Sequence, residues 1–142
     1  MNVYQDSAGT LWFPTNGRGL FRFHSGRLQA ITRKDGLPSS SVGNVWEDGK
    51  RNLWAASNHG IFRLGLKELY DFADGKIPSV LPVSYDLAEG MRSSECNDGI
   101  WQTTDGRIWF ATVRGVVAID PAAGSESGRI GNLNPQSALK KK

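Results

Sequence analysis

The sequence predicts an all-β protein, a partial β-propeller of about three four-stranded antiparallel blades with one short helical insertion. One pattern occurs three times, at residues 10–23, 52–64 and 107–119. In each copy an aliphatic residue and a Trp lead to a Thr or Ser, and a polar turn then closes on Gly before a mostly apolar stretch. The tryptophan spacings, 42 residues from Trp12 to Trp54 and 55 from Trp54 to Trp109, are close to the ~40 to 50 residues of a propeller blade. The 17 glycines and five tryptophans among 142 residues also favour a turn-dense β protein.

Each copy of the pattern is predicted to form a β-hairpin. Its two apolar segments are short and rich in β-branched and aromatic residues, and the Gly between them permits the positive φ of a tight turn. One hairpin cannot bury its own apolar face, so the copies must stack face to face. We therefore interpret the Trp of each copy as a packing anchor between neighbouring sheets rather than as a ligand platform.

The first blade is expected at residues 1–41. Strands are predicted at residues 3–5, 11–14, 20–23 and 28–32, separated by short turns. Residues 34–41 combine Gly, Pro and Ser, which is typical of an exposed connection that carries the chain from an outer strand to the next inner strand.

The second blade is expected at residues 42–96 and contains the insertion. A strand is predicted at 42–46, the repeated pattern supplies two more, and a fourth is predicted at 80–85. Residues 66–73 hold good helix formers with Leu69 and Phe72 three apart, so a short helix is expected there. An incomplete last blade is predicted at 97–121, and the polar tail, 122–142, is expected to be disordered.

Composition excludes several partners. The net charge is +3, and Lys and Arg are scattered among Asp and Glu. The sequence therefore has no basic stripe of the kind that binds nucleic acid, and no nucleic-acid partner is expected. The sequence contains no run of about 18 apolar residues that could span a membrane, so no membrane contact is expected. The first residues show no signal-peptide pattern. The single cysteine, Cys96, excludes an internal disulfide and a multi-cysteine metal site. No cofactor is expected.

The loops between the second and third strands, and those between blades, should lie on one face around the central channel. Arg18, His59 and Arg114 occupy equivalent positions in the three copies, and Asn58 and Arg92 fall in the same set of loops. Cationic side chains on one face could bind acidic or hydroxyl-rich groups such as those of a carbohydrate. The alternative is that they are solvated turn residues, because exposed Arg and His are common in turns.

The sequence offers little for catalysis or metal binding. His24 and His59 are the only histidines and fall in turns expected on opposite faces, so they should not share a metal or pair across a nucleophile. Cys96 lacks an orienting third group and is expected to be a structural thiol. The turns that begin at Asp6 and Asp105 resemble half of a calcium loop but lack its acidic spacing.

Several of these residues together resemble the two-component regulator propeller repeat. The resemblance rests on residues 35–39, 46–48, 53–54 and 60–63, and on 89–97, 105–110 and 115–116, which are similar to a last blade. It covers about residues 3–121. It implies the periplasmic sensor region of a bacterial hybrid histidine kinase or a related diguanylate cyclase, in which a β-sandwich, a transmembrane helix and the kinase would follow. The chain would then be a fragment that is periplasmic as part of a membrane-anchored parent.

The expected function is non-catalytic sensing of an extracellular ligand, with an oligosaccharide as the first candidate. The expected protein partners are the remaining blades of a parent propeller, or a second chain that associates through exposed sheet edges. Two other functions stay open. One is a fragment of a propeller enzyme, a lyase or glycoside-acting protein, with its site on missing blades, and the other is a protein-interaction scaffold.

Overall fold

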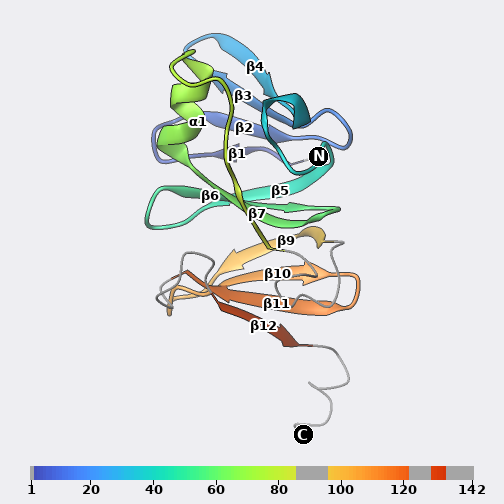
Figure 1. The fold of residues 1–142 in the computed structure, drawn as a ribbon. Helices are drawn as coiled ribbons and strands as arrows, with labels where there is room; N and C mark the ends of the chain where they lie inside the picture. Colours follow the sequence, from blue (N-terminus) through green and yellow to red (C-terminus); the bar gives the residue numbers. More distant parts are fainter. Residues whose placement is uncertain (1, 86–95, 122–128, 134–142) are drawn as a thin grey trace, which may run out of the picture.

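Three four-stranded antiparallel sheets make up the structure, a computed structural model that describes residues 2–85, 96–121 and 129–133. The strand orders are β1-β2-β3-β4, β5-β6-β7-β8 and β9-β10-β11-β12. The sheets follow one another in chain order down Figure 1. This arrangement confirms the predicted all-β fold of stacked blades with one short α-helix. We refer to the three sheets as blade 1, blade 2 and blade 3.

Blade 1 consists of β1 (Tyr4–Gln5), β2 (Leu11–Pro14), β3 (Leu20–His24) and β4 (Arg27–Ile31). A 3-10 helix, η1 (Arg33–Asp35), follows and ends at Gly36, whose φ is 116°. A Cβ on Gly36 would lie 2.2 Å from the carbonyl oxygen of Val80. Glycine is therefore required there, because this close approach joins the connection after blade 1 to the segment after the helix of blade 2.

Blade 2 consists of β5 (Val42–Glu47), β6 (Asn52–Ser57), β7 (Gly60–Gly65) and β8 (Val83–Tyr85), with α1 (Leu66–Ala73) inserted before β8. The predicted strand at 80–85 is thus shorter than expected. Val80 is only 1% exposed, and its N–H donates to the carbonyl of Asp35 rather than to a strand neighbour. Pro82 has no N–H to donate, so the strand begins after it.

Blade 3 differs from the expectation of an incomplete sheet. It consists of β9 (Cys96–Gln102), β10 (Ile108–Thr112), β11 (Gly115–Asp120) and a fourth strand, β12 (Arg129–Leu133). β12 pairs with all of β11 except Gly115. The expectation of a wholly disordered tail after residue 121 is therefore wrong at 129–133. A short strand with few strongly β-forming residues gives little signal by itself, and its main-chain pairing with β11 determines its conformation.

Two hydrophobic cores lie between the three blades. Alternate residues of β6 point to opposite faces of its sheet, so Leu53 and Ala55 join the core against blade 1 while Trp54 and Ala56 join the core against blade 3. Trp12 and Trp54 are 0% exposed, as expected of packing anchors. Trp109, the third member of the repeat, is only half-buried, because blade 3 has no further blade beyond it in the described chain.

A side-chain hydrogen-bond acceptor ties the first hairpin turn of each blade to the Trp six residues later, and in blades 1 and 2 this acceptor is a buried aspartate. Asp6 Oδ1 accepts two backbone N–H groups of its turn, at 2.9 and 3.0 Å, while Oδ2 accepts the indole N–H of Trp12 at 3.0 Å. Asp48 makes the same contacts at 2.8 and 3.0 Å, and the indole of Trp54 donates to it at 2.7 Å. In blade 3, Thr103 Oγ1 replaces the carboxylate as acceptor, at 2.9 Å. These aspartates therefore hold turns and anchor tryptophans.

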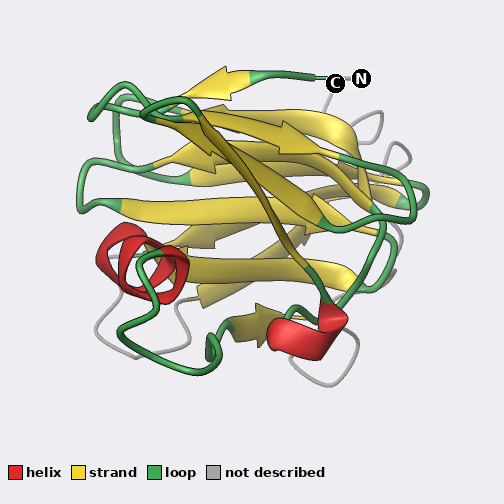
Figure 2. Cartoon of the chain, turned by 90° about the horizontal axis from the view of Figure 1, so that it is seen from above, coloured by secondary structure: helices red, strands yellow, loops and turns green. Residues whose placement is uncertain are grey.

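The helix α1 closes the outer side of the core between blades 1 and 2. Leu66 and Leu69 are fully buried in that core. Tyr70 stacks on Trp12 with the ring centroids 6.5 Å apart, and its hydroxyl donates to Asp6. Figure 2 shows α1 and η1 on one side of the strand layers. The insertion thus covers the outer side of this core.

Candidate functional site

The turn between the second and third strands is built in the same way in all three blades. A Thr or Ser hydroxyl donates to the carbonyl of the Gly that ends the turn, at 2.7 Å from Thr15, 2.8 Å from Ser57 and 3.1 Å from Thr112. The same oxygens accept a backbone N–H within the turn, at 3.1, 3.2 and 3.2 Å. The three N–H donors belong to Arg18, His59 and Arg114, which lie three residues after the hydroxyl in blade 1 and two residues after it in blades 2 and 3.

Backbone hydrogen bonds gather the turns of blades 1 and 2 on one face. The N–H groups of Gly17 and Gly19 both donate to the carbonyl of Ser40, at 3.0 and 2.8 Å, which joins the β2–β3 turn to the connection between the blades. The N–H of Asn58, in the β6–β7 turn, donates to the carbonyl of Ser41 at 3.3 Å. Asn16 and Ser41 also form an isolated antiparallel bridge. The connection is therefore held between two turns and is not a free loop.

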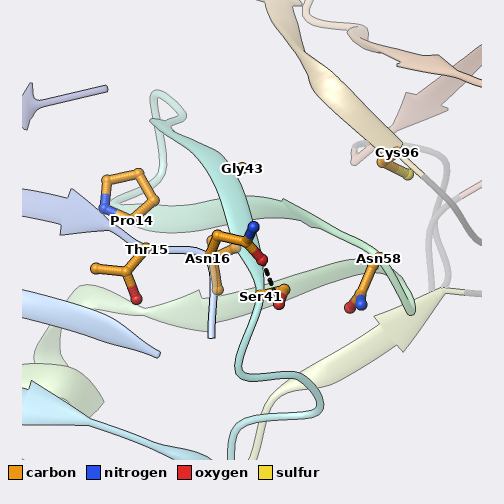
Figure 3. A pocket seen from close by; sticks show the side chains of 8 residues that line it. Pro14, Thr15, Asn16, Ser41, Gly43, Asn58 and Cys96 are labelled. Carbon is orange, nitrogen blue, oxygen red and sulfur yellow. Dashed lines mark hydrogen bonds between the residues drawn. The ribbon is translucent and has the colours of Figure 1, made fainter. Parts of the chain in front are cut away.

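A pocket of about 410 Å³ lies where these segments meet the start of blade 3 (Figure 3). It receives residues from the end of β2, the start of β5, the β6–β7 turn and the start of β9. Among the residues that the structure describes, its lining consists of Pro14, Thr15, Asn16, Ser41, Val42, Gly43, Asn58 and Cys96. The three blades thus contribute jointly to one concave site, of the kind that binds small ligands in proteins.

The polar groups of the pocket are amides and hydroxyls. Ser41 Oγ donates to Asn16 Oδ1 at 2.9 Å, as drawn in Figure 3, and the buried Ser39 Oγ donates to Asn58 Oδ1 at 2.6 Å. Both carbonyl oxygens are therefore engaged. The amide nitrogens of Asn16 and Asn58 make no hydrogen bond within the described part of the chain, so each keeps two N–H donors. None of the eight lining residues carries a carboxylate, an ammonium, a guanidinium or an imidazole.

Cys96 supplies the only thiol, at the blade 3 side of the pocket. Burial raises the pKa of this thiol to about 11, although a hydrogen bond from the backbone of Ser57 acts in the opposite direction. The group is therefore a neutral thiol at ordinary pH and a poor nucleophile. It is suited to packing against a ligand rather than to reacting with one.

Only one of the site residues predicted from the sequence lines the pocket in the described part of the chain. Asn58 lines the pocket. Arg18, His59 and Arg114 are exposed at the turns and do not line it, although the ring of His59 contacts Asn58 through Nδ1, 2.9 Å from Oδ1. Arg92 lies outside the described residues. The pocket and the row of cationic turn residues are thus neighbouring features of the same face, and Asn58 with His59 connects them.

Sequence reasoning missed Asn16 and Ser41 as pocket residues. Asn16 precedes the Gly of the first turn and Ser41 ends the connection between blades, so the sequence places both in the loops of this face without singling them out as ligand-binding residues. The signal that could have identified them is the alignment of the first and second copies of the repeat, in which Asn16 and Asn58 both follow the turn hydroxyl directly. Asparagines directly after the turn hydroxyl in two neighbouring blades indicate two side-chain amides on the same face of the stack.

The histidines do not form a site together. His24 lies at the end of β3, where its Nδ1 is 2.8 Å from Thr10 Oγ1 and its ring stacks near Tyr70. His59 lies in the β6–β7 turn, at the opposite end of the strands. Within residues 2–85, 96–121 and 129–133, no group of three or more His, Cys, Asp or Glu side chains is placed to hold a metal ion.

Comparison with known proteins places this fold in a functional context. No protein-family model matches the chain. Histidine kinase P4 of Formosa agariphila is 27% identical over 98% of the chain, which spans 9% of that protein. The extracellular domain of the hybrid two-component system BT3049 from B. thetaiotaomicron is 27% identical, with a TM-score of 0.67 over 84% of this chain and 15% of that one. The chain is similar to the sensor region of a two-component system.

The resemblance predicted from the repeat is thereby confirmed. A second sensor structure, the extracellular domain of BT4673 from the same organism, has a TM-score of 0.73 at 18% identity and covers 92% of this chain and 18% of that one. Virginiamycin B lyase from Staphylococcus aureus has a TM-score of 0.64 at 15% identity, covering 93% and 40%. At such identities these two likenesses show the fold alone. The chain spans less than a fifth of the length of the sensor proteins it matches.

The matched sensor domains are extracellular parts of two-component systems. In the part of this chain that the structure describes, no helix has the length and apolar character needed to cross a bilayer.

Proposed function

We propose that this chain is a non-catalytic, ligand-binding part of a histidine kinase sensor, and that its ligand is an extracellular carbohydrate. The observation that carries the proposal is the pocket between the three blades, where the polar side chains of the described lining residues end in amide and hydroxyl groups. The similarity to extracellular domains of hybrid two-component systems supports the sensor role. In such a protein the chain would lie in the periplasm, as part of a membrane-anchored whole.

The lining of the pocket suits an uncharged, hydroxyl-rich ligand. The amide nitrogens of Asn16 and Asn58 offer four N–H donors. The hydroxyls of Thr15 and Ser41 donate their protons within the protein, so their oxygens can act as acceptors for a ligand. Each sugar hydroxyl can both donate and accept a hydrogen bond, so one sugar can satisfy several of these protein groups at once. Binding would need no ionised partner and would therefore depend little on salt.

The same lining favours binding over catalysis. Hydrolysis or elimination at a sugar requires a positioned acid and base, for which carboxyl or imidazole groups are the usual choice. The eight pocket residues include neither, and the pKa of the Cys96 thiol is too high for it to act as a nucleophile at neutral pH. The fold likeness to virginiamycin B lyase is thus not matched by an acid–base pair among the described residues that line this pocket.

Titration calorimetry of the chain with neutral and with uronic acid-containing oligosaccharides tests the proposal. The double variant Asn16→Ala/Asn58→Ala should lose at least about tenfold in affinity for the neutral sugars, because removing a hydrogen-bond donor from a binding site costs about 1 to 3 kcal/mol. The matched control is Gln5→Ala, which removes an exposed amide in β1, outside the pocket. It should bind neutral sugars within about twofold of the original chain.

The acidic sugars separate the pocket from the cationic turns. One possible result is that acidic sugars bind, and that the double variant Arg18→Ala/Arg114→Ala abolishes their binding while the asparagine variant does not. In that case the ligand site is the row of cationic turn residues, and the pocket proposal fails. The proposal also fails if neutral sugars bind the asparagine variant as tightly as the original chain, or if no oligosaccharide binds at all.

A further inference from the structure

Two serines of the connection between blades 1 and 2 each bond the side chain of one pocket asparagine. Ser41 Oγ donates to Asn16 Oδ1 at 2.9 Å (Figure 3), and Ser39 Oγ donates to Asn58 Oδ1 at 2.6 Å. The two asparagines lie in turns of different blades, whereas the two serines are two residues apart in one connection. In both pairs the hydroxyl engages the amide oxygen, so the amide nitrogen is left for the pocket.

The side chain of Ser39 is buried beneath this face. It is 2% exposed and does not belong to the described lining of the pocket. Its oxygen accepts the backbone N–H of Ser41 at 3.0 Å. Its single proton has two acceptors within reach, the carbonyl of Ser41 at 3.3 Å and Asn58 Oδ1 at 2.6 Å. Because the contact to Asn58 is the shorter, the proton is directed to the asparagine.

His59 supplies a second donor to the same amide oxygen. Its Nδ1 lies 2.9 Å from Asn58 Oδ1. An amide oxygen can only accept a hydrogen bond, so the imidazole must carry a proton at Nδ1. The backbone N–H of His59 donates to Ser57 Oγ at 3.2 Å, which fixes the turn that carries the ring. Asn58 Oδ1 therefore has a protein donor for each of its two lone pairs.

These two donors determine which side of the Asn58 amide meets a ligand. Rotating an asparagine amide by half a turn exchanges its oxygen for its nitrogen, so a free side chain can offer an acceptor or two donors. Here the rotated amide would point N–H groups at the N–H of His59 and at the hydroxyl of Ser39. Both would then lose their acceptor, which favours the orientation with the oxygen turned toward them.

We propose that Ser39 and His59 are positioning residues, which hold the Asn58 amide so that its two N–H donors face the pocket. The blade 2 side of the pocket is then a donor site that takes an oxygen acceptor of the ligand. The inference rests on the proposed function, because a sugar oxygen is the expected acceptor. It assigns His59 a role through Asn58 and not as a cationic ligand of its own.

Nuclear magnetic resonance of the full chain tests the positioning without any ligand. At about pH 9, where imidazoles are neutral, the nitrogen signals of His59 should show the proton at Nδ1. The carbonyl-carbon signal of the Asn58 side chain should move upfield in Ser39→Ala, which removes one hydrogen bond to its oxygen. Ser79→Ala, at an exposed serine, is the matched control and should leave this signal in place. A neutral His59 with its proton at Nε2, or an Asn58 signal that Ser39→Ala does not move, overturns the proposal.

Titration calorimetry with a neutral oligosaccharide measures the effect on binding. Ser39→Ala and His59→Ala should each weaken binding by about three- to tenfold. His59→Asn, whose amide nitrogen can take the place of Nδ1, should bind within about twofold of the original chain. Circular dichroism melts of the variants confirm folding, and the His59 variants, at an exposed position, still test the proposal where Ser39→Ala does not fold.

The same substitutions in the Asn58→Ala background separate positioning from direct contact. There, neither Ser39→Ala nor His59→Ala should weaken binding further, because residues that act through Asn58 have nothing left to hold. A further loss in that background, or full affinity of both single variants, overturns the proposal. If no oligosaccharide binds the original chain, the proposed function fails, and the resonance experiment alone decides whether Ser39 and His59 hold the amide.

Discussion

At the scale of single residues, the buried aspartates of the turns stabilise the fold more than their place in a turn suggests. Asp6 and Asp48 are each 5% exposed, yet each accepts two backbone N–H groups and an indole N–H. A buried carboxylate is stable when its oxygens are fully hydrogen-bonded. Here it fixes the turn and the adjacent tryptophan with the same side chain, which explains why the acceptor and the Trp are six residues apart in each blade.

Removing one of these carboxylates should therefore destabilise the fold strongly. We expect Asp48→Ala to lower the free energy of unfolding by about 3 kcal/mol, because it leaves the indole N–H of Trp54 and two backbone N–H groups without an acceptor. Urea denaturation followed by circular dichroism measures this loss. Asp105→Ala, an exposed turn carboxylate in blade 3, is the control and should shift the midpoint far less. Equal shifts would show that the indole contact contributes nothing.

The thiol of Cys96 should be slow to react. Because burial raises its pKa to about 11, the thiolate fraction at pH 8 is about a hundredfold below that of an exposed cysteine, and alkylation should be slower by at least that factor. The rate should rise with pH up to about pH 11, since the thiolate forms only there. Iodoacetamide labelling followed by mass spectrometry measures it. Rapid labelling at pH 7 that is complete in the folded protein would contradict this assignment.

At the scale of elements, the stacking of blades depends on one tryptophan per interface. We expect Trp54→Ala to cost about 3 to 5 kcal/mol, since a fully buried aromatic side chain is replaced by a cavity. Trp109→Ala, at the half-buried third position, should cost clearly less. Urea denaturation of both variants measures the difference. A loss under about 1 kcal/mol for Trp54→Ala would remove the stacking account of the fold.

The helix α1 is attached to blade 1 by a polar contact as well as by its buried leucines. The hydroxyl of Tyr70 donates to Asp6, and Arg22 lies over the Tyr70 ring, 5.0 Å from its centroid. We expect Tyr70→Phe to lower stability by about 1 to 3 kcal/mol, because it removes a hydrogen bond to a charged group while the ring stays in place. Lys67→Ala, which removes only an exposed ion pair with Asp71 in the same helix, should shift the unfolding midpoint far less. An unchanged midpoint for Tyr70→Phe would mean that its hydroxyl does not hold the helix.

At the scale of the whole molecule, blade 2 belongs to both cores and should make unfolding cooperative. Ile31→Ala in the first core and Ile119→Ala in the second should each shift a single transition by about 2 to 5 kcal/mol. Tryptophan fluorescence and far-ultraviolet circular dichroism should give the same urea curve, which is the usual test of two-state behaviour. Separate transitions for the two signals, with each variant affecting only one of them, would show that the cores unfold independently.

The sequence alone determined the local units and their number. The Trp-containing pattern, the Gly that ends each turn and the alternation of apolar residues are properties of short segments, and they predict the hairpins and the stacked-blade fold. The helix formers at 66–73 likewise predict the short helix. The likeness to two-component sensors followed from the same repeated residues. These features depend on neighbours in the chain, and a repeat shows them three times over.

Only the tertiary structure decided which groups meet. The pocket joins Asn16, Ser41, Asn58 and Cys96 from different blades, and no local pattern fixes such a convergence. The strand β12 forms because β11 offers it main-chain partners, and the hydroxyl of Tyr70 reaches Asp6 across 64 residues of sequence. The sequence likewise gave no reason to distinguish Trp109 from Trp12 and Trp54. Its half-burial follows from its place on an end face, because burial is set by what packs against a residue and not by the residue itself.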